Sequence, residues 1–188
     1  MAKKRNWTPW IIVGILVILV LWTVGTYNSL IGLDNGVEEK WAQVENQYQR
    51  RADLIPNLIN TVKGFAAQEK DIFLEVTKLR SQWAGASSRN EKLAAAKGLD
   101  SGISKLLLVA ENYPQLKSNE NFLALQSQLE GTENRVATER KRYNEIVRKF
   151  NVKIKRFPSN IIAGMMGYEK KDYFESDEGS ETVPKVEF

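Results

Sequence analysis

The apolar side chains of residues 37–83 recur with alternating spacings of four and three, and this repeat constrains the fold more than any other feature of the chain. Such spacing is typical of a long α-helix that buries one stripe against partner helices. A straight helix of this length spans about 70 Å. Pro56 lies inside the pattern and predicts a bend or a split there. The stripe consists of Val37, Trp41, Val44, Tyr48, Arg51, Ile55, Leu58, Val62, Phe65, Glu69, Ile72, Val76, Leu79 and Trp83.

A second helix is predicted after a loop at residues 84–90. Its apolar face covers residues 93–110. The helix is expected to end before Pro114, because the residue that precedes a proline is pushed out of the helical region. Gly98 and Gly102 lower its helix propensity by about 1 kcal/mol each. They indicate either close contact with another helix or a weak element.

A third helix is predicted to begin at residues 118–120, and its apolar stripe has the same spacing as the first. It can therefore pack lengthwise on the first helix. Its stripe consists of Phe122, Leu125, Leu129, Thr132, Val136, Glu139, Tyr143, Ile146 and Phe150.

The apolar segment at residues 157–168 has two interpretations. Ser159 or Asn160 can cap a short helix here, and that helix either folds back to close one end of the bundle or places its Ile and Met side chains in a membrane surface or a partner's groove. The residues from 169 onward are acidic with few apolar side chains, which predicts a disordered tail. Its last residues, 183–188, form either a frayed end or a short linear motif.

An uncharged apolar run covers residues 9–25, and with its flanks it reaches the ~20 residues that cross a bilayer. Trp and Tyr side chains stand at both ends, as in an aromatic belt. A cleaved signal peptide begins in the same way, but this run is longer than a typical signal core and no small-x-small cleavage site follows it. Basic residues at positions 3–5 and acidic residues after the run predict a cytoplasmic N-terminus. We therefore expect a single-pass membrane protein whose remaining residues lie outside the cytoplasm.

These patterns predict an all-α fold, in which an N-terminal transmembrane helix precedes an elongated antiparallel bundle of three to four helices. Residues 28–36 are rich in polar residues and glycine and are interpreted as a hinge, with a helix that runs straight through them as the alternative. The predicted parts are a basic tail (1–6), a transmembrane helix (7–27), a helical bundle (28–168) and an acidic tail (169–188).

The chain contains neither cysteine nor histidine. This composition excludes disulfides, thiolate nucleophiles and the most common general base and zinc ligand. No pair of acids has a recognisable catalytic spacing, and neither a Gly-rich phosphate loop nor a GxSxG motif is present. We predict no enzymatic activity, cofactor or metal. The basic residues are interleaved with acidic ones, so nucleic acid is not an expected partner either.

The polar residues inside the apolar stretches are the candidate functional residues. Asp53, Asn57 and Asn60 recur at helical spacing beside the first stripe, and the third helix has a polar stripe that includes Asn134 and Asn144. If the two stripes face each other, they form a hydrogen-bond network that locks the register of the helices, because a slip leaves polar groups unsatisfied at ~1–3 kcal/mol each. A ligand site is the alternative interpretation.

The charged residues of the stripes are candidates for ion pairs between helices. Arg51 and Glu69 are the candidates on the first stripe, and Glu139 and Arg140 lie on or beside the third helix. Alternatively, their stems lie along the stripe and their charged ends reach water. The complete set of candidate network or interaction residues is Arg51, Asp53, Asn57, Glu69, Asn134, Arg140 and Asn144.

Motifs along nearly the whole chain resemble the LemA family of bacterial membrane proteins. They are YNSL (27–30), RRADLIPNL (50–58), VKGFA (62–66), ENYPQLK (111–117), LQ (125–126), LEGTEN (129–134), RKRYN (140–144) and FPSN (157–160). The resemblance implies one N-terminal membrane helix and a bundle of about four helices. It also implies a family with a poorly defined activity, in which some members are linked to envelope proteases or membrane remodelling, including one associated with magnetosomes. Leu33, Asp34 and Asn35 depart from the basic-polar turn expected of the family.

Two hypotheses of function follow. The first is a non-catalytic, membrane-anchored scaffold of the bacterial envelope, which forms homo-oligomers or organises the lipid bilayer or envelope partners. The alternative is an adaptor or sensor that binds and regulates a membrane protease or another envelope enzyme.

Overall fold

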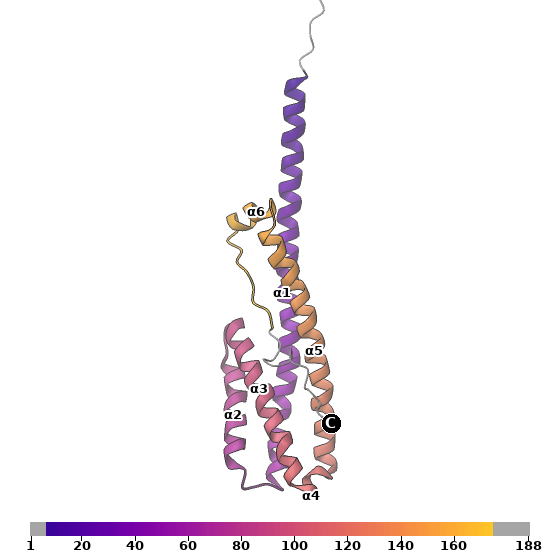
Figure 1. The fold of residues 1–188 in the computed structure, drawn as a ribbon, viewed down its shortest axis with the longest axis vertical. Helices are drawn as coiled ribbons and strands as arrows, with labels where there is room; N and C mark the ends of the chain where they lie inside the picture. The colour runs from indigo at the N-terminus through magenta and orange to yellow at the C-terminus, as the bar shows by residue number, and fades with distance from the viewer. Residues whose placement is uncertain (1–6, 175–188) are drawn as a thin grey trace, which may run out of the picture. The chain divides into compact units, whose positions relative to one another are not determined.

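The computed structural model describes residues 7–174, and all of their regular secondary structure is helical. The predicted all-α fold is confirmed. The basic tail at residues 1–6, and residues 175–188 of the acidic tail, lie outside the described residues. The elements are α1 (Thr8–Lys63), α2 (Lys70–Gly85), α3 (Arg89–Val109), the 3₁₀ helix η1 (Ala110–Asn112), α4 (Pro114–Lys117), α5 (Glu120–Lys155) and α6 (Ser159–Met165) (Figure 1).

Helix α1 continues without interruption through residues 28–36, so the predicted hinge is wrong. Leu30 and Val37 are fully buried in this part of the helix. Gly36 packs so closely on Ile146 of α5 that an added Cβ would lie 3.3 Å from its side chain. Tertiary packing of an apolar face therefore outweighs the weak helix propensity of the polar residues and glycines.

Pro56 does not split α1 either. A proline inside a helix removes the hydrogen bond to the carbonyl four residues earlier, which here belongs to Ala52. That carbonyl accepts a hydrogen bond from Nε of Arg80 on α2 at 3.1 Å. A side chain of the neighbouring helix thus replaces the donor that proline lacks.

The stripe of residues 37–83 belongs to two helices. A split of the long helix was one of the predictions, but the break lies at residues 64–69 and not at Pro56. Helix α1 ends at Lys63, and α2 begins at Lys70. In the turn between them, the amides of Phe65 and Ala66 both donate to the carbonyl of Val62. The apolar spacing survives the turn because the two helices bury their faces in a common core. Periodicity reports which side chains are buried and does not show that one helix continues.

The described residues divide into two compact units. The first contains residues 7–40 and 143–171, in which the first part of α1 is accompanied by the second part of α5 and by α6. Asn151 of α5 exchanges two hydrogen bonds with the backbone of Lys171, at 2.8 and 2.9 Å. The ammonium of Lys171 also lies 2.6 Å from a carboxylate oxygen of Asp34. The first residues of the predicted tail are therefore attached to this unit.

The second unit contains residues 41–142 and 172–174 among the described residues. It is an antiparallel arrangement of the second part of α1, α2, α3 and the first part of α5 (Figure 1). A Cβ added at Gly102 would lie 2.9 Å from Leu79 of α2, and one at Gly98 would lie 3.0 Å from the same side chain. The glycines thus mark close contact between α2 and α3, which was one of the two interpretations of their presence.

The first turns of α1 are apolar and exposed. Side-chain exposure reaches 74% at Trp10 and is still 40% at Trp22 and 46% at Tyr27. Among the described residues, α1 is the helix that is long and apolar enough to cross a membrane. Apolar side chains with no protein cover are expected where lipid surrounds a helix.

Candidate functional site

Arg51 is the centre of a polar cluster in the second unit. Its side chain is 3% exposed. One guanidinium nitrogen lies 2.8 Å from a carboxylate oxygen of Glu133 on α5, and the other lies 3.4 Å from a carboxylate oxygen of Asp100 on α3. A buried charge is tolerated only when it is paired in this way. The pairs join three helices at one level.

The carboxylate of Asp100 is shared by three side chains. Besides Arg51, it accepts a hydrogen bond from the hydroxyl of Tyr48 at 3.0 Å and one from Nη2 of Arg140 at 2.5 Å. With Glu133 included, these contacts join two arginines to two carboxylates. Pairs of opposite charge in a partly desolvated site stabilise one alignment of the helices.

Aromatic rings cover this polar cluster. The ring of Tyr48 lies 4.9 Å from that of Trp83 on α2 and 6.4 Å from that of Phe174. Phe174 also stacks on Trp41 at 5.8 Å. The guanidinium carbon of Arg140 lies 5.2 Å from the centre of the Tyr48 ring and 5.3 Å from that of Phe174. Rings at this distance attract a cation through their negative faces.

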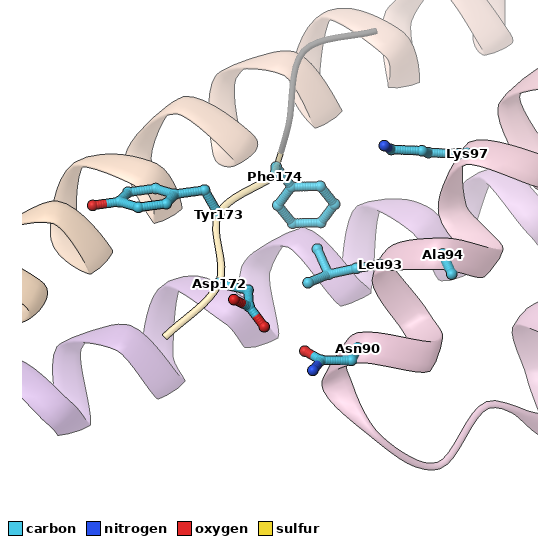
Figure 2. Close-up of a pocket in the computed structure, with 7 residues that line it drawn as sticks. All are labelled: Asn90, Leu93, Ala94, Lys97, Asp172, Tyr173 and Phe174. Carbon is cyan, nitrogen blue, oxygen red and sulfur yellow. The ribbon is translucent and has the colours of Figure 1, made fainter. Parts of the chain in front are cut away.

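Phe174 also forms one wall of a cleft of about 380 Å³. Figure 2 shows side chains of α3 on one side of it and the segment Asp172–Phe174 on the other. Among the described residues, the lining mixes apolar groups with one carboxylate and one ammonium. Its residues are Asn90, Leu93, Ala94, Lys97, Asp172, Tyr173 and Phe174.

Glu69 stands in a second polar contact, in the turn that precedes α2. Its carboxylate accepts a hydrogen bond from the hydroxyl of Tyr113 at 2.9 Å. That hydroxyl in turn accepts a hydrogen bond from the side-chain amide of Gln68. The hydrogen bond to Glu69 raises the pKa of Tyr113, because it favours the protonated phenol. Glu69 thus contacts a phenol and not the ion-pair partner that we expected for it.

The other predicted residues lie away from these contacts. Asp53, Asn57 and Asn134 are exposed, and Asn144 is half-buried in the first unit. Asp53 accepts a hydrogen bond from Gln49 of its own helix. The network predicted between Asp53, Asn57 and the third helix is therefore wrong. The reason is geometric, because Asp53 is two residues and about 200° around the helix from the buried Arg51.

The prediction named Arg51 and Arg140 but missed Asp100, the partner that they share, and Glu133, which pairs with Arg51. The signal for Asp100 is the clearer of the two. An available signal was its position between two glycines on the apolar face of the second helix, where a carboxylate requires partners. Glu139, the other expected partner, instead pairs with Arg142 on the same helix. Phe174 was missed because it immediately precedes an acidic run and was assigned to the tail.

Sequence comparison adds the relationship of the chain to known proteins. A model of the LemA family matches residues 40–188, which include the polar cluster and the cleft. The chain belongs to the LemA family. The family predicted from the sequence motifs is thereby confirmed. In this LemA family member, the matched region begins next to Trp41, the first residue of the second unit.

Several curated proteins are similar to this LemA family member. Magnetosome protein MamQ 2 of Paramagnetospirillum magneticum (strain ATCC 700264 / AMB-1) is 26% identical, over 83% of this chain and 67% of its own length. Magnetosome protein MamQ of Magnetospirillum gryphiswaldense (strain DSM 6361 / JCM 21280 / NBRC 15271 / MSR-1) is 22% identical over the same shares. Protein LemA of Metamycoplasma hominis (strain ATCC 23114 / DSM 25592 / NBRC 14850 / NCTC 10111 / PG21) is 22% identical, over 82% of this chain and 71% of its own length.

None of these names denotes an enzymatic activity. Family membership and the exposed apolar stretch of α1 together indicate a membrane-associated protein. Within residues 7–174, no group of three or more carboxylates is arranged to hold a metal ion. The polar cluster is suited to aligning helices.

Proposed function

We propose that this LemA family member is a non-catalytic, membrane-anchored scaffold of the bacterial envelope, which associates with copies of itself and organises the membrane or envelope partners. The observation that carries the proposal is the continuity of α1. One helix contains the exposed apolar stretch and then supplies buried residues to both units, from Leu30 to Val62. A scaffold needs such a direct connection between its anchor and its packed helices. Relatives named after the magnetosome, and not after a reaction, also favour a structural role.

The proposed orientation places the N-terminus in the cytoplasm and both packed units outside it, in a protein of the inner membrane. Lys3, Lys4 and Arg5 precede the apolar stretch, whereas Asp34 and Glu38 follow it. Positive charges are retained on the cytoplasmic side during membrane insertion.

Self-association is supported by apolar side chains on the surface of the second unit. Leu74, Leu108 and Leu123 are 69%, 64% and 47% exposed, on α2, α3 and α5 respectively. Contact with a second copy would remove such side chains from water, which is favourable at about 25 cal/mol per Å².

The mass of the detergent-extracted full chain tests the scaffold proposal. We expect a defined oligomer, with a protein mass that is a multiple of 21.4 kDa, when size-exclusion chromatography is combined with light scattering. The double variant Leu74→Gln and Leu108→Gln is expected to reduce the fraction of the chain in the oligomer. The control is Gln128→Ala at an exposed position, which is expected to leave that fraction unchanged. A monomer that copurifies with a membrane protease would contradict the scaffold and support the adaptor.

A further inference from the structure

Helix α6 has one face that packs on α1 and another that nothing in the described residues covers. On the packed face, Ile162 and Ala163 are 9% and 1% exposed and form a small core with Leu30 of α1. On the open face, Ile161 is 56% exposed and Met165 is 84% exposed. These two residues are four apart and therefore neighbours on one side of the helix. Phe157, four residues before Ile161 in the preceding turn, is 76% exposed.

The height of α6 along α1 is set by its contact with Leu30. Leu30 is three residues beyond Tyr27, where the predicted membrane-spanning stretch ends, and three helical residues correspond to about 4.5 Å. The headgroup region of a bilayer extends roughly 5–7 Å beyond the hydrocarbon core. Both elements belong to the first unit, and α6 lies beside α1 at this height (Figure 1). If residues 7–27 span the hydrocarbon core, the open apolar face of α6 therefore lies within the headgroup region.

The charges around α6 fit a lipid surface. Lys153, Lys155 and Arg156 precede the helix, and Lys170 follows it, while Glu169 is the acidic residue in the same stretch. Basic side chains that flank a small apolar face are typical of interfacial segments, because they attract anionic headgroups while the apolar groups enter the acyl boundary.

We propose that the face of Phe157, Ile161 and Met165 enters the interfacial layer of the same membrane that α1 crosses, so that α6 is a second membrane contact of the chain. This inference rests on the proposed membrane anchorage of α1. A lipid surface is favoured over a second copy as the occupant, because the face lies beside the end of the membrane-spanning stretch and basic side chains flank it.

Fluorophores attached to single cysteines in the full chain test this contact, since the chain has no cysteine of its own. The labelled positions are Ile161→Cys and, as a second exposed site on the same face, Met165→Cys. Val17→Cys in the apolar stretch reports the anchorage itself, and Glu145→Cys, exposed on α5 in the same unit, is the matched control. Each variant is checked for native helix content and reconstituted in vesicles of phosphatidylcholine and phosphatidylglycerol. Residues 145, 161 and 165 are tested with a lipid that has a nitroxide high on its acyl chain, and residue 17, at the middle of the span, with a lipid that has a nitroxide near the end of its acyl chain.

We expect a severalfold greater loss of emission at residues 161 and 165 than at residue 145, together with quenching at residue 17. Quenching at residue 17 without quenching at 161 and 165 would overturn the contact and leave the anchorage intact. Absence of quenching at residue 17 would overturn the anchorage and, with it, the inference. Protection of residues 161 and 165 from aqueous iodide without quenching by the lipid would assign the face to another copy of the chain and overturn the proposal.

Discussion

Arg51 has a full charge on a side chain that is 3% exposed, so its two ion pairs must compensate for the water that it loses. We predict that Arg51→Ala lowers the free energy of unfolding by about 2 kcal/mol. This is less than the 3–5 kcal/mol of a fully broken buried pair, because Asp100 keeps Arg140 and the side chain of Glu133 is 66% exposed. Urea unfolding of the detergent-solubilised chain, followed by circular dichroism, measures the loss.

The matched control for Arg51 is the double substitution Asp53→Ala and Asn57→Ala. Both side chains are exposed, and surface substitutions usually change stability by less than about 0.5 kcal/mol. A loss as large as that of Arg51→Ala would show that these residues contribute to the packing after all. A neutral double variant that no longer recruits an envelope protein would instead assign them to a binding surface.

The stability that Glu91 contributes at the start of α3 is expected to depend on pH. Its carboxylate accepts hydrogen bonds from the backbone amides of Ser87 and Ser88, which lower its pKa, while the Ser88 hydroxyl accepts one from the Glu91 amide. Because the folded pKa is lowered, this stabilisation is present above about pH 4.3, the ordinary pKa of glutamate, and is lost as the pH falls through the folded value. The difference in stability between the wild type and Glu91→Gln should therefore shrink on acidification. A difference that is independent of pH would contradict this assignment.

At the scale of single residues, the sequence predicts which positions need partners better than it predicts the partners themselves. Arg51 was identifiable because a charge interrupts an apolar stripe. Its partners, Asp100 and Glu133, were not, because the rotation of one helix against another depends on packing between side chains that are distant in sequence. Phe174 illustrates a further limit. A single buried ring at the edge of an acidic segment produces no periodic signal.

Among the elements, the contact between α2 and α3 depends on small residues. Gly131→Ala on α5 has open space around the new methyl group and is predicted to raise the free energy of unfolding by about 1 kcal/mol through helix propensity. Gly102→Ala gains the same propensity, but its methyl group would lie 2.9 Å from the end of Leu79, which must move. We expect Gly102→Ala to raise the free energy of unfolding, measured with urea, by clearly less than Gly131→Ala does, or to lower it. Equal gains at both positions would show that the contact is loose.

The boundaries of the elements were harder to predict than their faces. The stripe identified the buried residues of α1 but placed the break at Pro56, whereas the chain turns at residues 64–69. The cost of the proline is offset by Arg80, a residue of the next helix. Local rules for helix breakers cannot include a donor that arrives from another element.

For the whole molecule, orientation in the membrane decides where both units act. We predict that a membrane-impermeant maleimide labels Ser127→Cys, which is exposed on α5. The cells keep an intact inner membrane, and any outer membrane is made permeable to the reagent. Under the proposed orientation, Ala2→Cys, beside Lys3, Lys4 and Arg5, should react only after lysis. The opposite pattern of labelling would place the packed units in the cytoplasm and exclude envelope partners outside it.

The hydrogen bond between Arg80 and Ala52 also has a consequence for biosynthesis. The ribosome releases Ala52 and Pro56 before Arg80, which is 28 residues beyond Ala52. Until α2 docks, the Ala52 carbonyl can be satisfied by water alone, yet in the folded chain Ala52 is 2% exposed. This turn of α1 therefore becomes complete only when α2 supplies the donor. The Ala52 carbonyl therefore exchanges water for the Arg80 side chain only after α2 has been synthesised.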